Sequence, residues 1–445
     1  MSSTAVAGGV HGRPGPSALP GSWRNAGPWA MLAVTVSWLV LMVRQWPCVV
    51  EGSTDYLAMC YSDISALFYA RGLNEGLIPF LQSDVEYPVL TGAMMDLTRR
   101  LTNLFGGQTA PGLSSEQMAT SAGIFFGVNA VLLFAMFVLL VWTHLKLSRP
   151  WDALMIAASP AIMTTGLINW DALVVLLTSL GVLAWARRRP GWAGVWLGLG
   201  IAAKLYPVLL LVPLAVLCLR TSRWREFFVT LGATVGAWLA VNLPVYLATP
   251  QGWLNFWTFN VDRAGDLGSI WYALHLAGIE VRSVSTWVAG LMVLGTLAIC
   301  ALLLLAPRRP RFAQGVFLIV VLFVVLNKVY SPQYVLWLLP LLVLARPRWL
   351  DWTLFSIAEL FYYVAIWAHL DGELYTPQDG LYRFAIWFRV GVQLWLCAWV
   401  VRDILRPERD VVRLGGLDDP DGGVFDQALD APWLRRLRGS VPLDA

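Results

Sequence analysis

Long apolar runs recur along almost the entire chain, and they restrict its fold more than any other feature. The sequence is 58% hydrophobic and only 13% charged, whereas a soluble domain carries roughly 25% charged residues. Such runs predict membrane-spanning helices, because a helix satisfies its backbone hydrogen bonds within the bilayer. We therefore expect an all-α polytopic membrane protein with about 12 transmembrane helices, at residues 28–43, 119–143, 153–168, 171–186, 193–203, 207–219, 226–247, 283–306, 312–326, 333–345, 351–368 and 381–401.

Basic residues fall in every second connector between these runs, as in 146–149, 187–189, 220–225, 308–311 and 346–348. Positively charged connectors remain on the cytoplasmic side. This pattern predicts a multi-pass protein of the cell membrane with both termini inside, and a large first extracytoplasmic loop at 44–118. Residues 88–105 then do not span and are expected as an amphipathic interfacial helix. The net charge of +4 reports this orientation, so no nucleic acid partner is expected.

The chain divides into one membrane domain and two tails. Residues 1–27 are rich in Gly, Pro and Ser and predict a disordered cytoplasmic tail. Residues 28–401 form the expected integral membrane domain, and residues 402–445 predict a second cytoplasmic tail, charged and largely disordered. The runs 193–203 and 207–219 are too short for ordinary spans, which predicts broken helices that line a cavity.

The first outer loop is the acidic part of this apolar sequence. Asp55 and Asp63 are its candidate catalytic groups, and Asp63 heads a helical pattern directly after the first span. A carboxylate in this position suits a general base, although the same spacing also suits a helix N-cap on a solvated loop. Cys48 and Cys60 lie in the same loop and are candidates for a disulfide if the loop is extracytoplasmic.

Lysine occurs only at positions 146, 204 and 328, so each lysine is informative. Lys204 is flanked by apolar sequence, and its charge therefore needs water, a counter-ion or an anionic ligand. Lys328 is a second outward-facing lysine between two short runs. We predict that both bind one lipid phosphate, with snorkelling to the interface as the alternative for Lys204.

The segment Asn169-Trp170-Asp171 combines an amide, an aromatic ring and a carboxylate, which suits sugar binding. The alternative interpretation is a turn with an interfacial tryptophan. No His or Cys spacing resembles a metal site, and no nucleotide-binding motif follows a strand. We therefore expect neither a metal nor a cofactor.

These motifs in their order resemble glycosyltransferase family 87 of the GT-C superfamily, from about residue 30 to residue 400. The motifs are Asp63 in the acidic loop, Glu86-Tyr87-Pro88, Asn169-Trp170-Asp171, the run 198–207 through Lys204 to Tyr206-Pro207, and Lys328 before 331–334. Two departures leave acceptor and sugar open: Val89 stands where the family often has a second proline, and Asn169-Trp170-Asp171 replaces a commoner Gly-Asn turn.

The resemblance implies a GT-C-like enzyme that takes a sugar, commonly mannose, from a polyprenyl-phosphate donor. Transfer goes with inversion to a glycolipid or glycan acceptor outside the membrane, among membrane lipids. Asp63 is then the expected catalytic base, with Asp55 second, and Lys204 and Lys328 hold the donor phosphate. The expected substrate contacts are Glu86, Tyr87, Asn169, Asp171, Tyr206, Tyr330 and Gln333.

A multi-pass transporter or lipid flippase is the competing class, since it also has many spans and broken helices. Two features favour the transferase: the polar residues gather toward one face of the membrane, and the runs show no inverted repeat.

Overall fold

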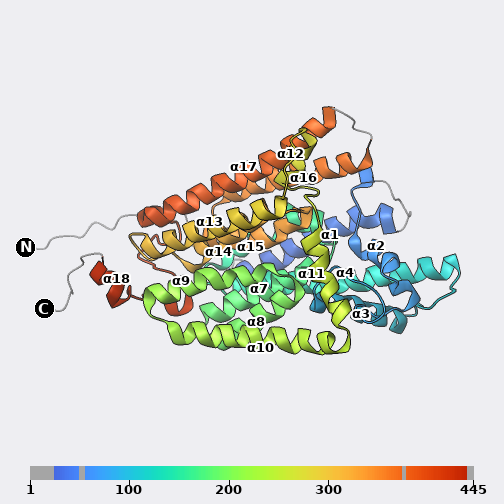
Figure 1. Ribbon diagram of the computed structural model, residues 1–445, viewed down its shortest axis with the longest axis horizontal. Coiled ribbons are helices and arrows are strands. Elements are labelled where there is room, and N and C mark those ends of the chain that lie inside the picture. The colour runs from blue at the N-terminus through green and yellow to red at the C-terminus, as the bar shows by residue number, and fades with distance from the viewer. Residues whose placement is uncertain (1–24, 50–55, 373–376, 438–445) are drawn as a thin grey trace, which may run out of the picture.

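The computed structural model describes residues 25–49, 56–372 and 377–437, and these are helical without a named strand. Nearly all of the predicted N-terminal tail, and Asp55, lie outside the described residues. The helices form an elongated bundle (Figure 1). Their bounds are α1 (Ala26–Val49), α2 (Asp63–Ala70), α3 (Val89–Leu104), α4 (Ser115–Leu145), α5 (Ala153–Ala157), α6 (Pro160–Thr165), α7 (Asp171–Ala186), α8 (Pro190–Ala203), α9 (Leu211–Thr221), α10 (Trp224–Ala248), α11 (Pro250–Asp262), α12 (Ile270–Leu276), α13 (Val284–Leu305), α14 (Phe312–Leu326), α15 (Val335–Ala345), α16 (Trp349–Asp371), α17 (Pro377–Leu405) and α18 (Pro432–Leu437).

Within the described residues, six helices are long and apolar enough to cross a membrane: α1, α4, α10, α13, α16 and most of α17. Four shorter apolar stretches, at 171–186, 206–221, 312–326 and 332–345, accompany them. The all-helical membrane architecture predicted from the sequence is thereby supported. The structure has fewer full-length spans than the twelve runs suggested, because several runs form short or broken helices.

One predicted span, 153–168, is divided into α5 and α6. Pro160 begins α6 and has no backbone N–H to continue the helix before it. The Ser159 hydroxyl accepts a hydrogen bond from the Ala161 N–H at 3.2 Å, which caps the new helix. The expectation of one continuous helix here was wrong.

The predicted break near Lys204 is present. α8 ends at Ala203, and Lys204 adopts an extended conformation with φ −164° and ψ 144°. A 3-10 turn over Tyr206–Leu210 then leads into α9. A second break separates α14 from α15, again next to polar residues. Both breaks lie against the cavity described below.

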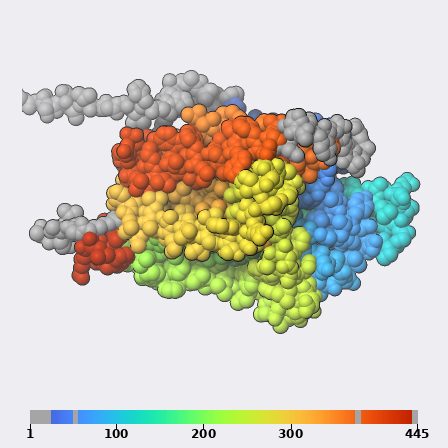
Figure 2. Space-filling view, turned by 45° about the horizontal axis from the view of Figure 1, so that its top comes forward, coloured from blue at the N-terminus to red at the C-terminus, as the bar shows by residue number. Residues whose placement is uncertain are grey.

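Exposure separates inner from outer helices. α14 and α15 bury most of their side chains. In the most apolar 18-residue stretch of each outer helix, by contrast, only 6% of the residues of α13 and 17% of those of α10 are buried. Apolar side chains that stay exposed along a long helix are expected to face lipid. The outer helices therefore form the surface toward the bilayer, and Figure 2 shows α13 and α17 along one such face.

The two ends of the bundle differ. The end that we call the site end gathers residues 56–105, α11 and α12 (blue and yellow at the right in Figure 1). There a disulfide joins Cys48 of α1 to Cys60. α3 matches the predicted amphipathic helix, and it buries residues such as Val89 and Met95. Its contacts are with α4, α8 and α10.

The opposite end, which we call the tail end, carries the C-terminal segment (red in Figure 1). Residues 406–437 are ordered against the bundle, so the prediction of a largely disordered tail was wrong for them. Phe425 is fully buried against Trp185, with the ring centroids 5.1 Å apart. Asp430 pairs with Arg220 at 2.7 Å. A buried aromatic ring and paired carboxylates fix a segment that charge and glycine content alone predict to be disordered.

Candidate active site

A cavity of about 420 Å³ opens at the site end of the bundle. Segments far apart in the sequence surround it: the start of α2, the turn before α7, the break after α8, α11, and the break before α15. The lining includes Tyr56, Tyr61, Asp63, Glu86, Tyr87, Asn169, Lys204, Phe256, Phe259, Arg263, Gln333, Tyr334 and Trp367. Most residues that the sequence predicts for the site therefore converge on one cavity.

Local hydrogen bonds position Asp63 at the first turn of α2. The Ser62 hydroxyl accepts from the Ile64 N–H at 3.2 Å, so Ser62 is the N-cap residue. The same hydroxyl donates to the Leu167 carbonyl at 2.5 Å, and the Asp63 N–H donates to the Ile168 carbonyl at 2.7 Å. Since Ser62 caps the helix, the Asp63 carboxylate is left to face the cavity.

The Asp63 carboxylate is surrounded by protein but has no close cation. The Tyr87 hydroxyl donates to Oδ2 of Asp63 at 3.2 Å. Within the described residues, Asp63 forms no ion pair. Burial raises the pKa of Asp63 to about 6, while hydrogen bonds from Tyr61 and Tyr87 and the charge of Lys204 lower it in part. A carboxylate with this pKa is ionised at neutral pH and more basic than a solvated aspartate, which suits proton abstraction.

Lys204 contributes the positive charge of the cavity. Its Nζ lies 2.6 Å from Oδ1 of Asp171, and 5.3 to 5.4 Å from the ring centroids of Tyr87, Tyr334 and Trp337. Aromatic faces attract a cation. The side chain is 17% exposed, so the ammonium group is held in place yet remains accessible from the cavity.

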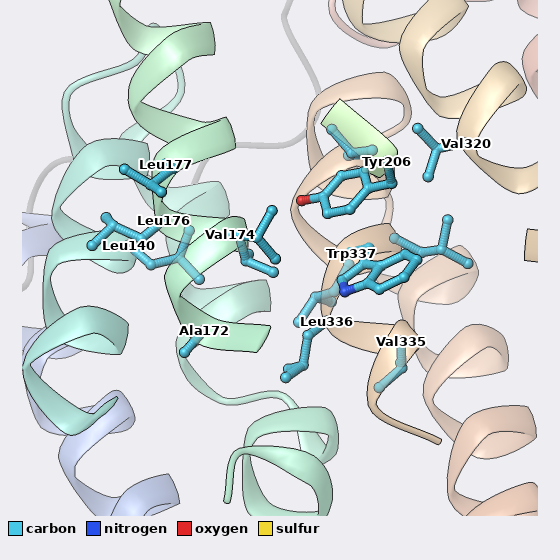
Figure 3. Close-up of a cluster of buried hydrophobic side chains, with 14 of the residues drawn as sticks. Leu140, Ala172, Val174, Leu176, Leu177, Tyr206, Val320, Val335, Leu336 and Trp337 are labelled. Carbon is cyan, nitrogen blue, oxygen red and sulfur yellow. The ribbon is translucent and has the colours of Figure 1, made fainter. Parts of the chain in front are cut away.

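Asp171 lies behind Lys204 and is 2% exposed. Its Oδ2 accepts from the Trp337 indole N–H at 3.0 Å. The Trp337 ring stacks on Tyr206 with the centroids 4.7 Å apart, as Figure 3 shows. Asp171 is thus the buried counter-ion of Lys204 and does not itself line the cavity.

Two amide side chains of the cavity wall have spare hydrogen-bonding capacity. Oε1 of Gln333 is buried and has no partner within the described residues. Nδ2 of Asn169 lies close enough to Tyr87 to affect its ionisation, but no hydrogen bond of normal geometry reaches it in the described part of the chain. One acceptor, Oε1 of Gln333, and one donor, Nδ2 of Asn169, are therefore available to a ligand. A buried polar group without a partner lowers the stability of the folded protein.

Aromatic rings from the segment before α2 and from α16 also line the cavity. Trp367 stacks on Tyr56, with the ring centroids 6.0 Å apart and the planes 11° apart, and Tyr61 lies 5.5 Å from the same indole. Rings beside unpaired amides, a carboxylate and an ammonium group form a site suited to a polyhydroxylated substrate that carries a phosphate.

The comparison with protein families identifies the enzyme class. Residues 111–327 match the model of glycosyltransferase family 87. Over these residues the chain is similar to the glycosyltransferases of family 87. No curated protein sequence matches it significantly. The matched region contains Asn169, Asp171, Lys204 and Arg263 but not Asp63 or Gln333.

Several predicted site residues of the glycosyltransferase lie outside the cavity wall. Tyr206 is buried, and its hydroxyl donates to Oγ1 of Thr178 at 3.0 Å. Tyr330 is buried beneath the guanidinium of Arg389, 3.5 Å from the ring centroid. Both tyrosines therefore contact the protein core rather than the cavity.

Lys328 does not join Lys204 in the cavity. Its Nζ donates to the carbonyls of Asn260 and Val261 at 3.0 and 2.9 Å. These carbonyls are in the last turn of α11, where intrahelical donors are absent and a cation is favoured. Helix capping thus accounts for the place of Lys328, and the predicted convergence of both lysines is not seen.

The structure adds one cation to the glycosyltransferase site that sequence reasoning missed. Arg263 lines the cavity and pairs with Asp266 at 2.7 Å, so it is the second cation there. Its sequence signal is weak, because it is one of several polar residues after α11. Glu86, which was predicted, also lines the cavity and pairs with Arg71 at 2.7 Å. Within the described residues, no His, Cys, Asp and Glu side chains group as a metal site.

Proposed function

We propose that this glycosyltransferase moves a sugar, mannose, from a polyprenyl-phosphate donor to a glycolipid or glycan acceptor on the extracytoplasmic side of the membrane. One observation carries the proposal. A basic carboxylate, Asp63, and an accessible ammonium group, Lys204, line the same cavity. These are the two charges that transfer from a sugar phosphate to a hydroxyl requires: a base for the acceptor and a cation for the leaving group.

In the proposed reaction Asp63 takes the proton of the acceptor hydroxyl. The acceptor oxygen forms a bond to the anomeric carbon as the bond from that carbon to the phosphate oxygen breaks, with inversion. The electron pair of the broken bond leaves with the polyprenyl phosphate. Lys204 stabilises the charge that develops on this phosphate.

The Lys204 environment suits a phosphate that binds and leaves. Asp171 and the aromatic rings keep the ammonium group ionised in apolar surroundings without covering it completely. Arg263 lines the same cavity and replaces Lys328 as the proposed second phosphate ligand. Asn169 and Gln333 then hydrogen-bond sugar hydroxyls, since each has an unpaired polar atom.

The cavity wall also offers a path for a lipid chain. Tyr87, Pro88 and Phe256 line both this cavity and a smaller one beside Trp238, Trp253 and Trp257 of α10 and α11. α10 belongs to the exposed outer surface. We place the polyprenyl chain of the donor along this aromatic track, which leads from the phosphate site toward the bilayer.

The donor is tested directly with purified full-length protein in phospholipid nanodiscs. Radiolabelled polyprenyl-phosphate mannose is incubated with the protein and a membrane lipid extract, and labelled products are separated by chromatography. We expect a labelled glycolipid that requires both protein and extract. Transfer from polyprenyl-phosphate arabinose but not from the mannose donor overturns the choice of sugar, and transfer from neither overturns the proposed donor class.

The orientation has its own test in whole cells. Single cysteines replace Gln82 at the site end and Arg225 at the tail end, both exposed, in a background without Cys218, Cys300 and Cys397. A membrane-impermeant maleimide is expected to label position 82 and not position 225. The reverse pattern overturns an extracytoplasmic active site.

A further inference from the structure

A second large cavity, of about 780 Å³, lies at the tail end, far from the candidate active site. α7 packs against both α4 and α8, and residues of these three helices line the cavity. The lining includes Leu180, Leu183 and Ala184 of α7, Trp142 of α4 and Trp196 of α8. We call it the tail-end groove.

Three cations border the tail-end groove: Lys146, Arg187 and Arg189. All three are exposed, and none forms an ion pair within the described part of the chain. Nη2 of Arg187 donates to the backbone carbonyl of Lys146 at 2.9 Å, which holds the ends of α4 and α7 together. Among the residues that the structure describes, no carboxylate lines the groove, so their charge there is entirely positive.

Aromatic rings accompany the cations of the groove. Nζ of Lys146 lies 5.4 Å from the ring centroid of Trp142. Trp192 stacks on Trp196 with the centroids 6.2 Å apart. Tryptophan prefers the membrane interface, where one edge is polar and the other apolar. The groove therefore combines cations, aromatic rings and aliphatic side chains.

We propose that the tail-end groove binds an anionic phospholipid. The phosphate group lies among Lys146, Arg187 and Arg189, and an acyl chain follows Trp142, Leu180 and Trp196 toward the bilayer. Charge complementarity decides the class of occupant: basic pockets between helix ends recognise anionic head groups, and a zwitterionic lipid gains less from three unpaired cations. The site is independent of the proposed sugar transfer, because no residue is shared between the two cavities.

Native mass spectrometry of the purified full-length protein tests the site, with phosphatidylglycerol and phosphatidylcholine as probes. The groove variant combines Lys146→Gln, Arg187→Gln and Arg189→Gln. The matched control combines Arg188→Gln, Arg225→Gln and Arg406→Gln, three exposed cations outside the groove. Each cation should contribute about fivefold to the affinity for the lipid. The groove variant, which lacks three cations, should therefore bind phosphatidylglycerol about 100-fold more weakly than the parent.

The control variant should retain nearly parental affinity, and phosphatidylcholine binding should change little in either variant. Equal losses in both variants would reduce the effect to net charge and overturn the site. Parental affinity in the groove variant leaves the groove to another occupant and also overturns it. Inorganic phosphate is the last probe: displacement of the lipid by millimolar phosphate means a free-anion site, whereas resistance to it supports a lipid ligand. Gel filtration confirms that both variants remain folded.

Discussion

Several buried charged side chains are fully paired at the tail end of the bundle, whereas those at the site end are only partly paired. At the tail end, Arg311 forms a two-point ion pair with Asp410, at 2.7 and 3.1 Å, and both side chains are at most 3% exposed. Arg346 likewise contacts both Asp351 and Asp403. At the site end, Asp63 has only hydroxyl partners, and Lys204 has a single carboxylate and an open side.

This difference distinguishes polar groups that stabilise the fold from polar groups that are available to a substrate. A buried ion pair whose hydrogen bonds are satisfied holds elements together, and the tail-end arginines thereby fix the C-terminal segment onto the helices. A polar group left incompletely satisfied in a cavity costs stability. The site end accepts that cost at Asp63, Asn169 and Gln333, where a bound substrate would supply the missing partners.

The largest expected effect is on transfer in Asp63→Asn. The amide keeps the size of the side chain and can still accept from Tyr87, but it is not a base. The rate should fall by about 10²- to 10⁴-fold, the usual contribution of a general base, while donor binding persists. Initial rates with labelled donor measure the first quantity and filter binding the second; near-parental turnover contradicts the assignment of the base.

At the tail end, Arg311→Met should act on stability instead. It removes the cation that hydrogen-bonds to the buried Asp410 and leaves Arg413, 3.9 Å away, as the remaining one within the described residues. Breaking a buried ion pair costs about 3–5 kcal/mol. Unfolding in a denaturing detergent measures the loss, and adding Asp410→Asn should recover part of it. Transfer per folded molecule should remain parental. A large loss of turnover without a loss of stability would mean that the two ends do not divide the roles as described.

An intermediate effect is expected at the ion pair of the site end. Lys204→Met alone leaves Asp171 buried and uncompensated, so the informative variant is Lys204→Met with Asp171→Asn. Its donor affinity should fall about 10- to 100-fold, as for the loss of a hydrogen bond to a charged group. Asp171→Asn alone, which retains the cation, is the matched control. Equal donor affinity in the control and the double variant removes Lys204 from the phosphate site.

The smallest effect is on the pH profile. Because Asp63 has a pKa of about 6, its basic form is lost as the pH falls through 6. The value of kcat/KM should therefore be level near pH 7.5 and fall about tenfold per pH unit below 6. Rates between pH 5 and 8 check this, and the residual activity of Asp63→Asn should lack the inflection. A parental profile that is flat to pH 5 is inconsistent with Asp63 as the base.

Much of the site could be predicted from the sequence because its polar residues lie in a few short segments within an otherwise apolar chain. Asp63, Glu86, Tyr87, Asn169, Lys204 and Gln333 were predicted, and all line one cavity. Lys328 was predicted with them on the strength of its rarity and flanking sequence. Its actual partners are backbone carbonyls of α11, which lies more than sixty positions earlier in the chain.

The sequence by itself determined the all-helical membrane fold, the broken helix at Lys204 and the polar end of the bundle, because hydropathy and the effects of proline act over a few neighbouring residues. Only the tertiary structure decided which charges meet. It placed Arg263 rather than Lys328 in the cavity, made Asp171 the counter-ion of Lys204, and ordered residues 406–437 on the tail-end arginines. The physical reason is that an ion pair depends on distance in space, and pairs such as Arg311 with Asp410 join residues whose separation in sequence carries no signal.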